Sequence, residues 1–115
     1  MEQKQFEDLV KTLCQQDALP AALEMLKSCD DEQVASAAQE LTGQFALAEV
    51  DGERRIYHVT VEQEDDGSEK EYVEHVMNEG EEVIRFVAWF FDSQFGMKRK
   101  DIYQMAGKTY RQPKR

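Results

Sequence analysis

The sequence predicts an α+β fold, with N-terminal helices packed on a four-stranded antiparallel meander, then a short C-terminal helix and a basic tail. Three observations lead to this class. Apolar residues recur at helical spacing near the N-terminus, turn signals then separate four runs rich in β-branched and aromatic residues, and basic residues gather at the C-terminal end. With 115 residues and 41% hydrophobic side chains, the chain suits one domain with its own core.

The expected domain covers residues 1–107. It divides into a helical layer (1–43), an antiparallel sheet (44–91) and a short helix (97–107). The boundary between the first two lies where the apolar spacing changes from a helical period to runs bounded by Gly-containing turns. Residues 108–115 form a basic tail that we expect to be flexible.

Three short helices are expected in the helical layer. Apolar side chains of residues 4–16 fall at i, i+3, i+4 and i+7, which is one face of a helix. Pro20 suits the first turn of the second helix, where a backbone N–H has no partner to lose. Asp30 or Asp31 can cap the third helix, and Gly43 is placed to terminate it.

Four strands are expected after the helices, because Gly-containing turns separate runs rich in Val, Ile, Tyr and Phe. Asp-Gly between such runs is a strong hairpin signal, since Gly tolerates the positive φ of the tight turns. A capping box at residues 68–71 also favours a helix for the third run, which we nevertheless predict as a strand. The expected strands are residues 44–50, 54–63, 69–77 and 82–91.

Two-residue turns then predict the register of the outer hairpins. In the first hairpin Glu49 would oppose Arg54 and Leu47 would oppose Ile56. Opposite charges facing each other favour both of these hairpins, each pair contributing roughly 0.2–1 kcal/mol. The last hairpin would pair Glu74 with Arg85, Val73 with Phe86 and Tyr72 with Val87.

The middle hairpin breaks this rule. Centred on Asp66-Gly67, a two-residue turn sets Glu64 against Glu69 and Glu62 against Glu71, and like charges directly opposite are destabilising. Either the tip frays into solvent, or the third run is helical, or the acids await a cation or a basic partner. The candidate partner-binding residues of this acidic hairpin are Glu62, Glu64, Asp65, Asp66, Glu69 and Glu71.

Both faces of the predicted sheet are apolar, unlike those of a half-solvated antiparallel sheet. One face would carry Tyr57, Val59, Val61, Tyr72, Val76, Val83, Val87, Trp89 and Phe91; the other would carry Phe45, Leu47, Ile56, Val73, Met77, Ile84, Phe86, Ala88 and Phe90. The helical layer can cover only one of them, and the other needs the C-terminal helix, a curl of the sheet or a second molecule. A single short helix covers little of a four-stranded sheet. We therefore expect a homodimer; the alternative is a register error of one residue, which would exchange the faces of a strand.

Charge is unevenly placed along the chain. The net charge is −10, yet residues 97–115 hold seven bases and one acid. An acidic body disfavours nucleic acid as a partner except through the C-terminal tail. The candidate residues of the basic end are Lys98, Arg99, Lys100, Lys108 and Arg111. This end is either solvated or folded back on the acidic body, or it docks onto nucleic acid or an acidic protein.

The sequence contains no motif for catalysis or for cofactor binding. Cys14 and Cys29 lack zinc-ligand spacing, and we expect buried thiols rather than a disulfide. His58 and His75 are predicted cross-strand neighbours that could bind a metal or titrate near neutral pH. They lack a third donor, so ordinary sheet histidines are the preferred interpretation. We expect no enzyme activity, no metal and no cofactor.

No apolar run approaches the roughly 20 residues of a membrane-spanning helix. The N-terminal residues lack the basic-then-apolar order of a signal peptide, so we expect a cytoplasmic protein with no membrane association. The leading hypothesis is a protein-binding adaptor, chaperone-like or regulatory protein that uses its acidic and apolar surface to hold a basic protein partner. The alternatives are an acidic nucleic-acid mimic or immunity-type inhibitor, and a small ligand-binding or catalytic domain.

Overall fold

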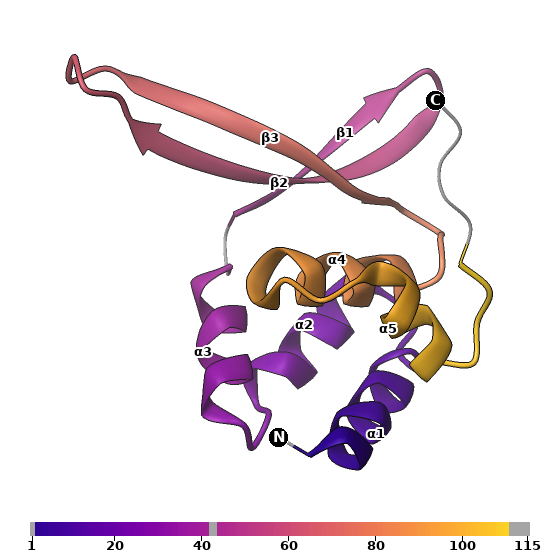
Figure 1. The fold of residues 1–115 in the computed structure, drawn as a ribbon. Helices are drawn as coiled ribbons and strands as arrows, with labels where there is room; N and C mark the ends of the chain where they lie inside the picture. Colours follow the sequence, from indigo (N-terminus) through magenta and orange to yellow (C-terminus); the bar gives the residue numbers. More distant parts are fainter. Residues whose placement is uncertain (1, 42–43, 111–115) are drawn as a thin grey trace.

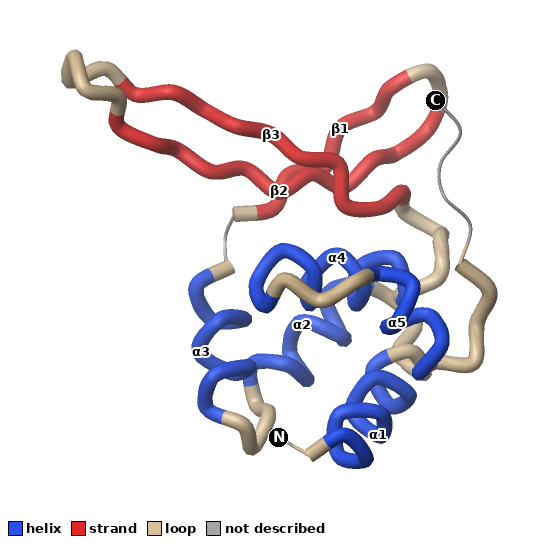
Figure 2. The backbone as a smooth tube through the Cα atoms, in the orientation of Figure 1, coloured by secondary structure: helices blue, strands red, loops and turns tan. Residues whose placement is uncertain are grey.

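Five helices and one three-stranded antiparallel sheet make up residues 2–41 and 44–110, the part of the chain that this computed structural model describes. Figures 1 and 2 show the sheet on one side of the helices, with α4 directly beneath it and α1 and α3 farther away. The fold is therefore α+β, as predicted. The elements are α1 (Gln3–Leu13), α2 (Leu19–Lys27), α3 (Glu32–Glu40), β1 (Phe45–Val50), β2 (Glu53–Gln63), β3 (Glu69–Asn78), α4 (Ile84–Phe95) and α5 (Arg99–Met105).

The three N-terminal helices confirm the sequence prediction. Pro20 lies in the first turn of α2. Asp31 is the N-cap of α3, and its carboxylate accepts a hydrogen bond from the backbone N–H of Val34 at 3.1 Å. Helix α3 ends at Glu40, and the predicted terminator Gly43 lies outside the described residues. Caps and apolar spacing are local signals, which is why the sequence was sufficient here.

The first hairpin also has the predicted register. Leu47 lies opposite Ile56 and Glu49 opposite Arg54 in the β1–β2 pair. Asp51 and Gly52 both take positive φ, 53° and 83°. A tight turn with positive φ at both central residues matches the twist of the flanking strands, so this turn determines the register.

The predicted fourth strand is wrong, because residues 84–95 form helix α4. The pairs expected for the last hairpin, Glu74–Arg85, Val73–Phe86 and Tyr72–Val87, therefore do not exist as strand partners. A short run that is apolar at every position has no period, so it is equally compatible with a buried strand and a buried helix. The fully or nearly buried residues of α4 are Ile84, Phe86, Val87, Ala88, Trp89, Phe90 and Phe91.

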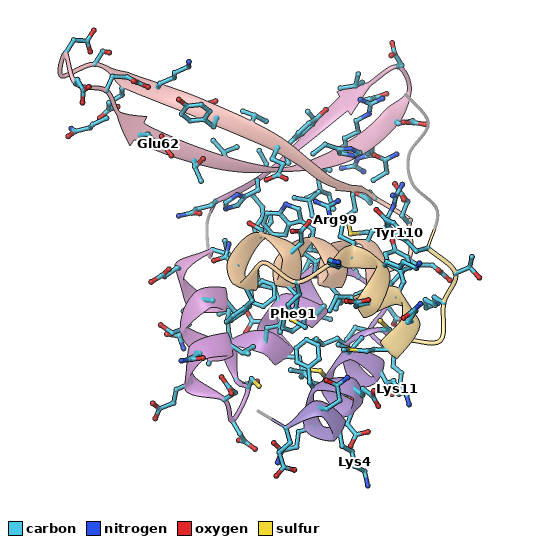
Figure 3. The ribbon with its side chains drawn as sticks, in the orientation of Figure 1. Lys4, Lys11, Glu62, Phe91, Arg99 and Tyr110 are labelled. Atoms are coloured by element: carbon cyan, nitrogen blue, oxygen red, sulfur yellow. The ribbon has the colours of Figure 1, made fainter. Side chains whose placement is uncertain are left out.

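The middle of helix α4, residues 86–91, is buried on all sides because it lies between the sheet and the other helices. On the sheet side the ring of Phe45 packs edge-on against Trp89, with centroids 5.9 Å apart. On the opposite side Phe91 meets Phe6 of α1 at 4.7 Å, and Figure 3 shows Phe91 on the side of α4 toward the N-terminal helices. Thus α4, rather than the predicted N-terminal layer, forms the floor beneath the sheet.

The two sheet faces differ from the prediction. We call the side toward α4 the inner face and the opposite side the outer face. A β-bulge at Val76 shifts β3 by one residue, so that Met77 pairs with Ile56 while His75 pairs with Tyr57. Val73 therefore shares the outer face with Val59, not the inner face with Ile56. No described helix packs against the outer face (Figure 1).

The predicted C-terminal helix is confirmed as α5, which buries Ile102 and Tyr103. It ends at Met105, and Gly107 follows with a φ of 71°. The chain then continues along the body, where the rings of Tyr103 and Tyr110 lie 5.0 Å apart.

Candidate functional site

The distal hairpin, which we define as residues 61–75, projects from the body of the molecule. Strand β1 pairs with β2 only as far as His58, so beyond that point β2 and β3 form a two-stranded ribbon. Figures 1 and 2 show this ribbon extending past the helices. All 15 of its residues are solvent-exposed. It is held by its own ladder of hydrogen bonds and adds nothing to the core.

The distal hairpin carries seven carboxylates and one lysine. The structure brings all six predicted acidic site residues together on this ribbon: Glu62, Glu64, Asp65, Asp66, Glu69 and Glu71. Figure 3 places Glu62 well out along the ribbon. Without a body beneath it, this concentration of negative charge faces solvent on both sides.

The predicted register of this hairpin is wrong by one residue. Glu62 lies opposite Lys70 rather than Glu71, and Glu69 lies opposite Gln63 rather than Glu64. The turn is longer than assumed, because residues 64–68 form the loop and the backbone N–H of Glu64 donates to the Ser68 carbonyl at 2.8 Å. This shift removes the like-charge pairs, so no two carboxylates lie directly opposite each other in the β2–β3 ladder.

The loop itself is ordered by Asp66. Its carboxylate accepts hydrogen bonds from the hydroxyl and the backbone N–H of Ser68, at 2.6 and 2.9 Å. These bonds to the charged form lower the pKa of Asp66. The backbone N–H of Gly67 donates to the carbonyl of Glu64, and its φ of 86° is a conformation that favours glycine. The acidic tip is a structured turn rather than a loose end.

Apolar side chains on the distal hairpin are a feature that the sequence analysis misplaced. Val61 and Val73 are 57% and 54% exposed on the outer face, and Tyr72 is 41% exposed on the other. The prediction assigned them to covered sheet faces. The signal for exposure was the density of carboxylates among them, because acids on both faces of a strand pair exclude burial of either face.

The candidate basic residues that the structure describes differ in their surroundings. Arg99 donates to Asp92 of α4 at 2.7 Å, and the Lys108 ammonium lies 3.2 Å from a Glu82 carboxylate oxygen. Lys98 and Lys100 are exposed at the start of α5, while Arg111 lies outside the described residues. Of the four candidate cations that the structure describes, Arg99 and Lys108 are thus paired with acids of the body; most of the predicted basic tail, residues 111–115, lies outside the described residues.

His58 and His75 are not neighbours on one face, contrary to the prediction. His58 lies opposite Glu74 on the inner face, whereas His75 pairs with Tyr57 on the outer face. The His58 Nε2 lies 2.8 Å from the Gln44 side-chain oxygen, and its ring lies 5.0 Å from Trp89. Among the described residues no three His, Cys, Asp or Glu side chains converge to hold a metal ion.

Burial lowers the pKa of His58, an effect that nearby Glu74 partly opposes. Below the unfolded value of about 6.5, the unfolded chain binds a proton that the folded chain does not, so stability should fall on acidification. We expect the free energy of unfolding to decline from pH 7 to pH 5, with this residue contributing at most about 1.4 kcal/mol per pH unit.

Denaturant unfolding at several pH values checks this expectation in the wild type and in His58→Leu. The carboxylates titrate in both proteins, so the difference between the two curves isolates His58. The wild type should lose stability more steeply with falling pH than the variant, and parallel curves would contradict the expectation.

Two hollows on the body offer no convergent catalytic group. One, of about 760 Å³, lies between α1 and the α2–α3 turn and is open to solvent; Cys29, Asp30 and Asp31 line one side of it. The other, of about 430 Å³, lies under the inner face beside Leu19 and Leu47. Cys14 and Cys29 are both free thiols and half-buried, and burial raises the pKa of Cys14.

Comparison of the chain with protein-family models, with curated proteins and with solved structures finds no match. Within residues 2–41 and 44–110, no helix has the length and apolar character needed to cross a membrane. The choice of the distal hairpin as the candidate site is therefore supported by its geometry and charge alone.

Proposed function

We propose that this chain is a non-catalytic, cytoplasmic protein-binding module that presents its distal hairpin to a basic groove on a protein partner. The observation that carries the proposal is the exposure of all 15 hairpin residues, which include Val61, Tyr72 and Val73. The ribbon contributes no residue to the hydrophobic core, and its carboxylates repel one another, which lowers the stability of the fold. A purely structural role therefore does not explain the ribbon.

Charge and apolar surface have separate roles in this proposal. The carboxylates steer association with a basic partner and reject acidic surfaces. The aromatic ring of Tyr72 and the two valines supply area that can be buried at the contact, since a purely charged contact in water contributes little affinity. The partner is therefore a protein whose basic groove has an apolar floor.

The nucleic-acid mimic is less well supported than the adaptor. A mimic needs its carboxylates arranged as one stripe along one face. Here Glu62 and Glu74 lie on the inner face, Glu69 and Glu71 on the outer face, and the remaining acids in the loop. The acids are thus spread around a tip, which suits insertion into a groove better than imitation of a phosphate backbone.

A charge-matched pair of variants tests the proposal. The first variant, Glu62→Gln, Glu64→Gln, Asp65→Asn and Asp66→Asn, neutralises the tip, and the amide oxygens introduced at positions 64 and 66 can still accept the loop hydrogen bonds. The control neutralises four carboxylates of the N-terminal helices and of the turn between α2 and α3: Asp8→Asn, Asp30→Asn, Glu32→Gln and Glu40→Gln. Both variants change the net charge by the same amount, so a difference between them reflects position.

The measurement is quantitative co-purification from the native host, followed by titration with the purified partner. We expect the wild type and the control to recover the same stoichiometric protein, and the tip variant to bind it at least tenfold more weakly. Affinity should also fall as salt rises. Recovery of no stoichiometric protein, or equal binding by the tip variant, would refute the proposal. Competition of the partner's own nucleic acid with the chain would instead favour the mimic.

A further inference from the structure

The sheet has two free edges, and they differ in charge. Strand β2 lies between β1 and β3, so β1 and β3 each have one side without a neighbouring strand among the described residues. The charged residues of β3 are Glu69, Lys70, Glu71 and Glu74. Charged side chains on an edge strand discourage pairing with another chain. Strand β1 reads FALAEV and has one charge, Glu49, so it is the edge that can accept a further strand.

Alternate residues of β1 direct their backbone groups toward this open side. The N–H of Val59 donates to the Gln44 carbonyl at 2.7 Å, and hydrogen-bonded pairs alternate along an antiparallel ladder. Residues 44, 46, 48 and 50 therefore bond β2. The N–H and C=O groups of residues 45, 47 and 49 point away from β2, and no described residue hydrogen-bonds them. Three donors and three acceptors, in groups about 7 Å apart, form a template for an added strand.

A hollow lies below this edge, on the inner face of the sheet. Its volume of about 430 Å³ extends from Phe45 and Leu47 of β1 to Leu19 and Pro20 at the start of α2. The side chain of Leu47 is 48% exposed. Side chains of directly paired residues lie on the same face of a sheet. An added residue opposite Leu47 would therefore place its side chain beside Leu47, at the border of the hollow, and an apolar side chain suits that position.

Charge defines the neighbouring position. Glu49 lies opposite Arg54, but the Arg54 guanidinium lies 3.5 Å from Glu79 instead. No described cation forms an ion pair with Glu49. Asp17 adds a further carboxylate on the rim of the hollow. A strand added antiparallel to β1 thus fits best with a basic residue opposite Glu49 and with apolar residues two and four positions later.

We propose that the free edge of β1 binds an extended peptide segment of another protein, with the pattern basic–x–apolar–x–apolar. Backbone hydrogen bonds to residues 45, 47 and 49 hold the segment, while Glu49 and the hollow select its side chains. Ala46 and Ala48 face the outer side, so the two intervening positions accept any residue. This site is separate from the proposed function, because β1 pairs with β2 only as far as His58 and lies outside the distal hairpin.

A second copy of β1 fits this edge less well than such a segment. Strand β1 contains no basic residue, so no register of two β1 strands gives Glu49 a cation. Two chains of net charge −10 also repel each other. Charge therefore favours a segment of different sequence.

A peptide titration followed by NMR tests the proposal on the isotope-labelled full chain. The peptide acetyl-Ser-Lys-Thr-Val-Thr-Ile-Ser-amide places its lysine opposite Glu49, its valine opposite Leu47 and its isoleucine opposite Phe45. Ordering a short peptide opposes binding, so we expect a dissociation constant of about 0.1 mM. At saturation the amides of residues 45, 47 and 49 should exchange with solvent at least about fivefold more slowly. The amides of Ala46 and Ala48 already bond β2 and should change little.

Methylation of the peptide backbone separates strand pairing from other modes of binding, and it uses the wild-type protein. A methyl group on the valine nitrogen removes the N–H that donates to the Leu47 carbonyl, so it should weaken binding at least about tenfold. The matched control carries the methyl group on the preceding threonine, whose N–H points away from β1. It should bind within about twofold of the parent peptide. Equal effects of the two methyl groups would overturn the proposal.

Substitutions in the protein test the selection of side chains. Glu49→Lys should bind the peptide about fivefold more weakly, and a peptide with glutamate in place of lysine should regain the loss. Leu47→Lys should weaken binding at least about tenfold, because it places a charge at the border of the hollow. Ala46→Lys adds the same charge to the outer side of the same strand and should bind like the wild type.

The distal-hairpin variant with four neutralised carboxylates should also bind the peptide like the wild type, so a failure of the proposed function would leave this result unchanged. Absence of binding at about 2 mM peptide, or spectral changes confined to other elements, would overturn the proposal. Slow exchange of the three edge amides in the protein alone, increasing with protein concentration, would show a second copy at this edge and would overturn it as well.

Discussion

Replacement of Phe91 by alanine should lower the free energy of unfolding by about 3–5 kcal/mol, the usual cost of emptying a large aromatic site in a core. Phe91 is fully buried, and its ring contacts Phe6 of α1 and Phe90 of its own helix. The cavity would therefore open between α4 and the N-terminal helices. Domains of this size are stable by only about 5–15 kcal/mol, so the melting temperature should fall by about 10–20 °C.

Phe95→Ala is the matched control, because it removes the same side chain one turn farther along α4. Phe95 is 38% exposed and still touches Phe90 and Phe91. Its loss should cost about 1 kcal/mol or less. Urea unfolding followed by far-UV circular dichroism measures both variants. Equal losses in the two variants would contradict the central position of Phe91.

Removal of the projecting ribbon should abolish partner binding while leaving the fold intact. The variant replaces residues 60–72 by Asn-Gly, a dipeptide that supports a two-residue hairpin turn between Val59 and Val73. Residues 61–72 are all exposed, so their loss should change the free energy of unfolding by about 1 kcal/mol or less. If the ribbon is the binding element, affinity for the partner should fall at least a hundredfold.

Unfolding curves and binding titrations of the same preparation separate the two effects. The charge-neutralised tip variant remains the test of the tip alone. A shortened chain that still binds the partner would exclude the ribbon as the binding element. A chain that loses more than about 3 kcal/mol of stability would show that the ribbon supports the core.

The acidic site was visible in the sequence, but its arrangement was not. The cluster of carboxylates around Asp66-Gly67 correctly indicated a hairpin tip rich in negative charge. The pairing of those carboxylates was predicted wrongly, because turn length decides register and a two-residue turn was assumed. Asp66, by bonding Ser68, stabilises a longer loop, and this contact changes every pair along the ribbon.

The assignment of residues to the two sheet faces also could not be predicted from the sequence, here because of the other end of the hairpin. The bulge at Val76 carries both Val76 and Met77 into the core. An extra residue in one strand leaves no distinct trace in an alternating sequence pattern, so Val73 was assigned to the wrong face. Val61 and Val73 are exposed because no described helix packs against the outer face, and Tyr72 is exposed because the ribbon extends past the helices.

The amino-acid sequence alone determined the α+β class, the three N-terminal helices, the first hairpin and the acidic tip. Each depends on caps, turn residues or periodic spacing within a few neighbouring positions. Tertiary structure alone decided the state of residues 84–95. Their middle, residues 86–91, is apolar at every position, and such a run takes its conformation from what surrounds it, here the sheet on one side and α1 on the other. It also decided that this helix lies under only the near half of the sheet, and so left the ribbon beyond it open to a partner.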